Sequence, residues 1–133
     1  MSAAIQPEAK GVVLAVDDEP GVRELSRRIL EQGGYTVLEA EHGQQALDLI
    51  ESGAHVDFLM VDLDMPVMRG EVLAEHIRAR RADLRVLYVT AHADDLFRTR
   101  PELREGEAFL DKPFSIRGLL EAVSLLKNGF ITP

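Results

Sequence analysis

The chain has 133 residues, 46% of them hydrophobic and 29% charged, which predicts one globular domain with a core of its own. It contains no cysteine, which excludes disulfides and thiolate metal sites and makes the cytoplasm the expected compartment. The formal net charge of −8 argues against direct binding to nucleic acid or to an anionic membrane, and no apolar run has the length of a membrane span.

Five short and nearly continuous apolar runs follow a polar, aperiodic lead-in at residues 1–10, which is interpreted as disordered. Runs of this kind are typical of strands that are covered on both faces of a sheet. They are Val12–Val16, Tyr35–Glu39, Phe58–Val61, Val86–Val89 and Ala108–Leu110. One domain over residues 11–127 and a tail over 128–133 are therefore expected.

Helical patterns separate most of these runs. The apolar stripes are Val22/Leu25/Ile29, Ala46/Leu49/Ile50, Leu73/Ile77 and Ile116/Leu119/Leu120/Val123. Pro20 suits the first turn of the first helix, Gly33-Gly34 ends it, and Ser115 is expected to cap the last one. Gly70 is expected to supply backbone freedom where the third helix begins.

The segment Asp94–Gly106 has a different character from the other connections. It is highly charged, and Pro101 lies in its middle, where a proline costs a helix about 3 kcal/mol. A short or irregular fourth helix is expected there.

Strands that alternate with helices predict an α/β fold with a doubly wound, five-stranded parallel sheet. The flavodoxin-like strand order 2-1-3-4-5 is expected. In such sheets ligands bind beyond the carboxyl ends of the strands, at the point where the strand order reverses.

Polar residues lie at four of these strand ends. Asp17-Asp18 follow the first strand, Asp62 the third and Thr90 the fourth, and Asp111-Lys112-Pro113 follow the fifth. In the expected strand order Asp17, Asp18 and Asp62 converge, with Thr90 and Lys112 opposite them. Each motif taken alone has a plainer interpretation as a helix cap, a turn residue or an exposed loop charge. Their joint occurrence at the right strand ends favours a site.

Three converging carboxylates repel one another by about 4 kcal/mol per close pair at an effective dielectric constant of 20. Such a cluster raises its pKa values or binds a cation. Oxygen ligands favour a hard ion such as Mg²⁺. A metal on one side, an ammonium group on the other and a carboxylate nucleophile between them suit phosphoryl transfer.

Four segments carry a resemblance to the receiver domains of bacterial two-component response regulators. They are VLAVDDEP at Val13–Pro20, FLMVDLDMPVMRG at Phe58–Gly70, LYVTAH at Leu87–His92 and FLDKPF at Phe109–Phe114. The resemblance runs from about Gly11 to Lys127. It implies a signalling module, not an enzyme with turnover, that receives a phosphoryl group from a histidine kinase or a histidine phosphotransfer protein and regulates a downstream partner.

The resemblance also assigns roles to individual residues. It implies that Asp62 is the phosphoacceptor, that Asp18 binds Mg²⁺ directly, and that Asp17 acts largely through water. The remaining implied roles are a Mg²⁺-binding backbone carbonyl at Asp64, a switch hydroxyl on Thr90, a phosphoryl-pairing ammonium on Lys112, a switch aromatic at Phe109 and a cis peptide bond between Lys112 and Pro113.

Two features depart from the usual receiver pattern. Asp64 and His92 are ionisable groups that flank the path of the hydrolytic water, so both are expected to modulate dephosphorylation. The charged segment before the fifth strand resembles receivers that stand alone or that belong to hybrid histidine kinases.

Other functions fit less well. Asp62-Leu63-Asp64 superficially resembles the signature of haloacid-dehalogenase-like phosphatases, but there the signature strand comes first and the paired acids come last. The chain also has no room for the cap domain of such an enzyme. A degenerate receiver that serves only as a binding module is disfavoured because all the expected site residues are present.

Overall fold

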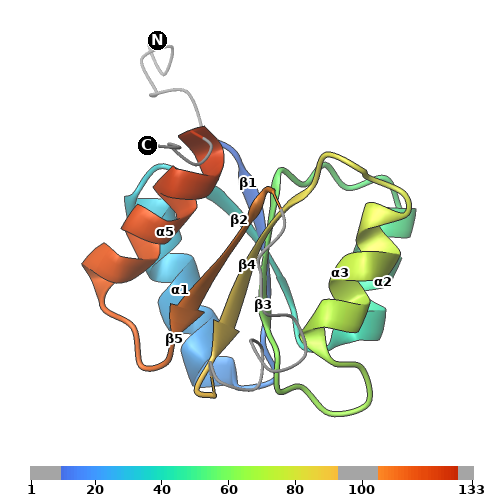
Figure 1. Cartoon of the computed structure of the whole chain (residues 1–133), viewed down its shortest axis with the longest axis horizontal. Coiled ribbons are helices and arrows are strands. Elements are labelled where there is room, and N and C mark those ends of the chain that lie inside the picture. Colours follow the sequence, from blue (N-terminus) through green and yellow to red (C-terminus); the bar gives the residue numbers. More distant parts are fainter. Residues whose placement is uncertain (1–9, 93–104, 129–133) are drawn as a thin grey trace, which may run out of the picture.

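The computed structural model describes residues 10–92 and 105–128. Its elements alternate between strand and helix as predicted (Figure 1). They are β1 (Val12–Val16), α1 (Pro20–Gln32), β2 (Thr36–Ala40), α2 (Gly43–Glu51), β3 (Phe58–Asp62), α3 (Gly70–Arg78), β4 (Arg85–Thr90), β5 (Glu107–Asp111) and α5 (Ile116–Asn128). The expected fourth helix falls almost entirely on residues outside the described ranges.

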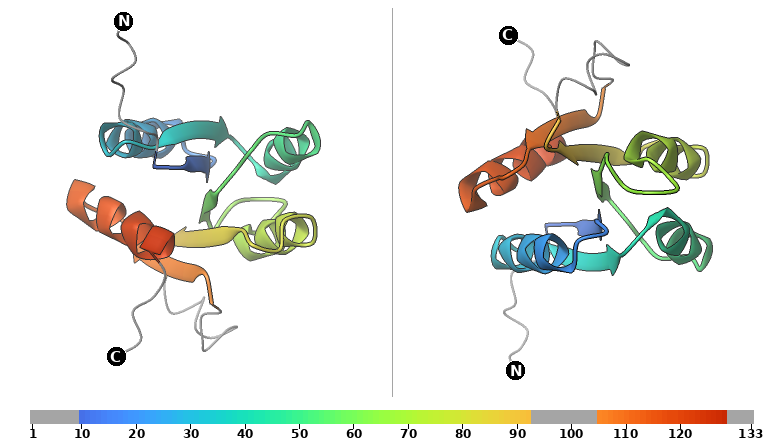
Figure 2. Two further views of the ribbon diagram at one scale, coloured as in Figure 1. Left: turned by 90° about the horizontal axis from the view of Figure 1, so that it is seen from above. Right: turned by 90° about the horizontal axis from the view of Figure 1, so that it is seen from below.

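The five strands form one parallel sheet in the order β2-β1-β3-β4-β5, which confirms the predicted fold class. Helices α1 and α5 cover one face of this sheet, and α2 and α3 cover the other (Figures 1 and 2). Each face has its own apolar core, and all five side chains of β3 are buried between the two. The apolar runs are therefore nearly continuous because the helices exclude water from both sides.

The prediction for the second strand was wrong by one residue at each end. It was expected at Tyr35–Glu39, whereas β2 spans Thr36–Ala40. The amide of Tyr35 donates to the carbonyl of Leu30 and so completes the end of α1, while Ala40 pairs in register with Val16 of β1. Hydrogen bonding at the helix end, rather than side-chain polarity, decides where the strand begins.

The outer boundaries also differ from the expected ones. Lys10, assigned from the sequence to the lead-in, donates its amide to the carbonyl of Gly34 at 3.0 Å. At the other end α5 continues through Asn128, which was assigned to the tail. Ser115 caps this helix as expected, because its hydroxyl accepts a hydrogen bond from the amide of Gly118 at 2.9 Å. Within the described residues no helix is both long and apolar enough to cross a bilayer.

A buried ion pair joins the end of α3 to β5. The Glu107 side chain is fully buried, and its Oε2 accepts hydrogen bonds from Arg78 Nη1 at 2.7 Å and from the Tyr88 hydroxyl at 2.9 Å. A carboxylate is tolerated at this depth because charged and polar donors replace its lost hydration. The network thus connects the last residue of α3, the middle of β4 and the first residue of β5.

Candidate phosphoacceptor and metal site

The predicted site lies at the carboxyl edge of the sheet, where the strand order reverses. From β1 the chain crosses outward to β2, and then returns to pair β3 with the other side of β1. Val16 pairs with Val61, so that Asp17 and Asp62 follow them side by side. Parallel pairing thus converts two acidic motifs that are 45 residues apart in the sequence into neighbours.

Three carboxylates meet at this edge. One ligand oxygen from each of Asp17, Asp18 and Asp62 can be chosen so that the three atoms lie within 4.8 Å of one another. Asp17 and Asp62 are buried, whereas Asp18 is exposed to solvent. The structure therefore brings together the three acids that the sequence predicted to converge, with one open side.

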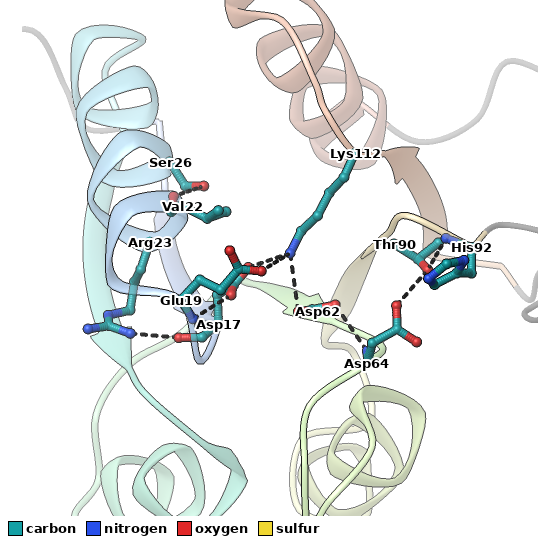
Figure 3. Close-up of polar contacts among 10 residues, drawn as sticks. All are labelled: Asp17, Glu19, Val22, Arg23, Ser26, Asp62, Asp64, Thr90, His92 and Lys112. Carbon is teal, nitrogen blue, oxygen red and sulfur yellow. Dashed lines mark hydrogen bonds and ion pairs between the residues drawn. The ribbon is translucent and has the colours of Figure 1, made fainter.

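The ammonium group of Lys112 faces this acidic cluster from the loop after β5 (Figure 3). Its Nζ donates to Asp17 Oδ2 at 3.0 Å and to Asp62 Oδ2 at 3.2 Å, and it lies 3.9 Å from Glu19 Oε1. Burial alone would lower the pKa of Lys112, but its hydrogen bonds and the charges of Asp17 and Asp62 outweigh burial and raise the pKa. The Lys112–Pro113 peptide bond is cis.

Every polar group of Asp17 takes part in a hydrogen bond. Its amide donates to the carbonyl of Ala40 at 3.2 Å, its Oδ1 accepts from the amide of Glu19 at 2.9 Å, and its Oδ2 accepts from Lys112. Burial raises the pKa of the Asp17 carboxyl, although these hydrogen bonds and the charge of Lys112 oppose the rise. Without a cation, the ionised form of this side chain is therefore costly.

Asp62 is connected to Thr90 through Asp64. The Oδ1 atom of Asp62 accepts a hydrogen bond from the amide of Asp64 at 3.0 Å. The carboxylate of Asp64 in turn accepts from the hydroxyl of Thr90 at 3.1 Å, and this hydroxyl accepts from the amide of His92 at 2.8 Å (Figure 3). Thr90 is completely buried, whereas its partner Asp64 is exposed to solvent.

The other predicted residues lie near this site or on its strands. The side chain of His92 is exposed, and its amide is the group that reaches Thr90. Phe109 is partly buried on β5 and packs against the core on the α2/α3 face of the sheet, which Tyr88, its partner in register on β4, also joins. Phe109 therefore lies on the strand that leads to Lys112, two residues before Asp111.

The role expected for Gly70 was wrong. Gly70 does not have a positive φ, so the start of α3 does not need the backbone freedom of glycine. Its Cα instead packs against β3, where an added Cβ would lie 2.6 Å from the carbonyl oxygen of Asp62 and 3.1 Å from Leu63 Cα. The requirement is steric: a side chain at position 70 would push α3 away from the backbone of Asp62.

Arg23 was not among the residues predicted to belong to the site. This arginine of α1 donates from Nη1 to the backbone carbonyl of Asp17 at 2.6 Å, and its side chain is 12% exposed. The signal available in the sequence was weak. An arginine placed six residues after an aspartate, one turn into a helix, is usually a solvated charge on the exposed face.

The donor set of this site fits a hard divalent ion. It offers carboxylate oxygens from the loop after β1 and from the last residue of β3, one of them on the exposed side chain of Asp18, and no sulfur or imidazole among the clustered groups. Mg²⁺ binds few carboxylates and keeps several waters, a pattern that suits an open cluster of this kind. The three carboxylates also repel one another. Lys112 offsets part of this repulsion, and a bound cation would offset more of it.

Comparison with known proteins gives a consistent result. Residues 13–124 match the model of the response regulator receiver domain. The chain is 38% identical over 112 residues to the sensor kinase CckA of Brucella abortus, a match that covers 84% of this chain and 12% of that protein. It is 35% identical over 114 residues to the response regulator MprA of Mycolicibacterium vanbaalenii, covering 86% of this chain and 49% of that protein. The chain thus spans half or less of these relatives.

Solved structures agree with this match. The receiver domain of the hybrid histidine kinase CckA superposes with a TM-score of 0.74 at 32% identity, covering 88% of this chain and 99% of that one. The response regulator TrrA of Thermotoga maritima, solved in complex with Mg²⁺-BeF, gives a TM-score of 0.73 at 31% identity, with 87% and 98% coverage. These similarities lend no support to a phosphatase of the haloacid-dehalogenase type.

Proposed function

The chain belongs to the response regulator receiver domain family, and we propose that it accepts a phosphoryl group on Asp62 and changes conformation in response. The donor is a phosphohistidine of a histidine kinase or of a histidine phosphotransfer protein, both of which act in the cytoplasm. The output is a change in affinity for a downstream partner. Dephosphorylation returns the domain to its resting state, so the chain works as a signalling module and not as an enzyme with steady turnover.

One observation carries this proposal: Asp62 is buried at the switch point between an acidic cluster and a lysine. One ligand oxygen each of Asp17, Asp18 and Asp62 lie within 4.8 Å of one another, and Lys112 Nζ bridges Asp17 Oδ2 at 3.0 Å and Asp62 Oδ2 at 3.2 Å. Each oxygen of Asp62 has one hydrogen-bond donor, the amide of Asp64 for Oδ1 and Lys112 Nζ for Oδ2, and these two contacts fix the direction of the carboxylate. A carboxylate that is fixed in direction beside an ammonium group and a cluster able to hold a cation suits a phosphoryl acceptor.

The transfer step balances within this geometry. A carboxylate oxygen of Asp62 attacks phosphorus, the new P–O bond forms the acyl phosphate, and the P–N bond to the donor histidine breaks. The histidine leaves with the electron pair of that bond and takes up a proton. Lys112 holds one oxygen of Asp62 in place during the attack and remains to pair with the charged product.

The residues that would hold Mg²⁺ are Asp18 directly, Asp17 largely through water, Asp62, and the backbone carbonyl of Asp64. When bound, the ion neutralises charge on the transferring phosphoryl group. Asp17 contributes mainly by position, because its four hydrogen bonds fix the loop from which Asp18 projects.

Switching would run through Thr90 and Phe109. The phosphoryl group adds negative charge beside Lys112 and provides a new acceptor for the hydroxyl of Thr90. Thr90 lies at the end of β4, and Phe109 lies on the neighbouring strand β5. Asp64 and His92, which contact Thr90 on either side, would set the lifetime of the phosphorylated state through their effect on the hydrolytic water.

A second candidate is a receiver segment within a larger hybrid histidine kinase. The similarity to the sensor kinase CckA favours this candidate, because the match covers only 12% of that longer protein. The donor would then be the kinase core of the same polypeptide. Sequencing the full transcript that encodes this chain distinguishes the two candidates, because only a hybrid kinase carries a kinase core upstream in the same reading frame.

The experiment that tests the proposed function measures stoichiometry against turnover. The purified chain is incubated with Mg²⁺ and acetyl phosphate, and both the bound phosphate and the released inorganic phosphate are followed. We expect at most one phosphoryl group per chain and no hydrolysis of simple phosphomonoesters. Steady turnover of phosphomonoesters with no bound phosphate would instead indicate a phosphatase.

A further inference from the structure

Arg23 connects the acidic loop to two other segments of the chain. Its Nη1 donates to the carbonyl oxygen of Asp17 at 2.6 Å. Its Nε lies 3.6 Å from Glu39 Oε1 on β2, and its Nη2 lies 3.9 Å from Glu41 Oε1 just beyond that strand. One guanidinium group thus joins α1, the loop after β1 and the end of β2, and the side chain that carries it is 12% exposed. Figure 3 shows its contact with the carbonyl of Asp17.

The carbonyl that Arg23 binds belongs to the peptide unit between Asp17 and Asp18. Fixing its oxygen fixes the plane of that peptide, and the plane sets the direction in which the next residue, Asp18, leaves the backbone. Among residues 10–92 and 105–128, no group donates a hydrogen bond to the carboxylate of Asp18 itself. The position of this side chain therefore depends on the backbone that carries it.

The charge of Arg23 is compensated. Glu39 and Glu41 both lie within 4.0 Å of its guanidinium nitrogens, so the group is oriented by anions of its own. A bidentate or forked donor that is oriented in this way holds a carbonyl more firmly than a flexible lysine would. A loop that is held before the cation arrives loses less conformational entropy on binding it.

We propose that Arg23 is a positioning residue for divalent-cation binding, because it fixes the Asp17–Asp18 peptide and thereby directs Asp18 toward the cation. This inference rests on the proposed function, since it takes Asp18 as a ligand of Mg²⁺. It assigns Arg23 no contact with the ion or with the phosphoryl group. Outer partners of metal ligands commonly change metal affinity by about ten- to a hundredfold.

The same helix offers a matched control. Arg27 lies one turn after Arg23 and also pairs with Glu39, at 3.2 Å, and with Glu31, at 3.1 Å. It has no hydrogen bond to the loop of residues 17–19. Substituting either arginine with glutamine removes one positive charge from the same face of α1, whereas only the change at Arg23 releases the carbonyl of Asp17.

The test is a calorimetric Mg²⁺ titration of the unphosphorylated full chain in four forms: wild type, Arg23→Gln, Arg23→Lys and Arg27→Gln. We expect the dissociation constant to rise about tenfold in Arg23→Gln relative to Arg27→Gln. Arg23→Lys, which keeps one donor but loses the fork, should lie between them. Loss of a positive charge alone would tighten Mg²⁺ binding, so the sign of the effect separates positioning from electrostatics.

A second measurement separates affinity from chemistry. The rate of phosphorylation by acetyl phosphate is followed as a function of Mg²⁺ concentration. We expect the half-saturating Mg²⁺ concentration to rise about tenfold in Arg23→Gln, while the rate at saturating Mg²⁺ stays near that of wild type. Should Arg23→Gln fail to fold, Arg23→Lys carries the test, with an expected rise of about threefold.

Equal Mg²⁺ affinities in the Arg23 and Arg27 variants would overturn the inference, as would tighter binding in Arg23→Gln. Either result leaves the proposed function intact, because wild type would still bind the ion. A wild-type chain that binds no Mg²⁺ would overturn the proposed function instead.

Discussion

The hydroxyl of Thr90 donates its hydrogen bond to Asp64 Oδ2 at 3.1 Å, and Asp64 is the residue two positions after Asp62, the proposed phosphoacceptor. A threonine hydroxyl has one proton to donate. In this state that proton serves Asp64, so Thr90 must give up this partner before it can bind a phosphoryl group on Asp62. Under the proposed function, Asp64 therefore competes with the phosphoryl group for the hydroxyl of Thr90.

The first prediction concerns this competition. Replacing Asp64 with alanine removes both the competing acceptor and a negative charge beside the incoming phosphoryl group. We expect phosphorylation by acetyl phosphate at saturating Mg²⁺ to become about tenfold faster, which corresponds to a difference of about 1.4 kcal/mol. Glu75→Gln, which removes an exposed charge from α3, serves as the control and should leave the rate unchanged. A slower reaction in Asp64→Ala would show that Asp64 assists the transfer.

The second prediction concerns the pH dependence of stability. Burial raises the pKa of Asp17, so the folded state retains its proton in a pH window above 3.8, where the unfolded state has lost it. Stability without Mg²⁺ should therefore rise as the pH falls through this window. Asp17→Asn removes this dependence and should be more stable than wild type at pH 7 in the absence of Mg²⁺.

Thermal unfolding with and without Mg²⁺ measures this effect. The advantage of Asp17→Asn should shrink as the pH falls through this window, because the folded wild type takes up its proton there, and should disappear when Mg²⁺ stabilises wild type by mass action. A variant that is less stable than wild type at pH 7 without Mg²⁺ would mean that the hydrogen bonds to Asp17 outweigh its burial.

The third prediction concerns Lys112, whose side chain is 15% exposed and pairs with two buried carboxylates. Lys112→Met leaves those carboxylates uncompensated, and breaking a buried pair in this way costs about 3–5 kcal/mol. Because Mg²⁺ supplies positive charge to the same oxygens, the ion should restore part of the loss. Denaturant unfolding should show a larger stabilisation by Mg²⁺ in the variant than in wild type; equal stabilisation would argue against a shared site.

The fourth prediction concerns Gly70. An alanine there would place its Cβ 2.6 Å from the carbonyl oxygen of Asp62, so α3 or the end of β3 must shift. Overpacking of this kind costs about 1–3 kcal/mol, and we also expect phosphorylation to slow. Gly21→Ala is the control, because a Cβ at position 21 of α1 meets nothing within 4 Å, and the substitution should be neutral or stabilising. Equal stability of the two variants would contradict the steric explanation.

The fifth prediction concerns the buried pair of Arg78 and Glu107. Glu107→Ala leaves the guanidinium of Arg78 and the hydroxyl of Tyr88 without their shared acceptor, and we expect a loss of about 3–5 kcal/mol in the free energy of unfolding. Glu105→Ala, an exposed acid two residues earlier, should change stability by less than about 0.5 kcal/mol. A loss in Glu107→Ala no larger than that of the control would show that the pair contributes little.

The sheet and its site could be predicted because both depend on short-range patterns. Apolar runs mark strands that are covered on both faces, and parallel pairing brings their carboxyl ends to one edge, so Asp17 and Asp62 had to meet once the strand order was known. The order itself came from the topology usual for such sheets and from the family resemblance.

What escaped prediction depends on contacts across the fold. In the sequence, Glu107 looks like an exposed charge beside a strand. Only its pairing with Arg78, 29 positions earlier, explains why its side chain is buried. Arg23 reads as an exposed charge until the carbonyl of Asp17 is seen beside it. Gly70 was expected to be needed for backbone freedom, because the close approach of the start of α3 to the end of β3 leaves no local signal in the sequence.

The central claim is that Asp62, and not another acid of the cluster, receives the phosphoryl group. The most direct measurement is the intact mass of wild type, Asp62→Asn and Asp64→Asn after incubation with Mg²⁺ and acetyl phosphate or a phosphorylated histidine kinase. We expect one phosphoryl group on wild type and on Asp64→Asn, and none on Asp62→Asn. Equal labelling of Asp62→Asn and wild type, or no labelling of wild type by any donor, would contradict the account.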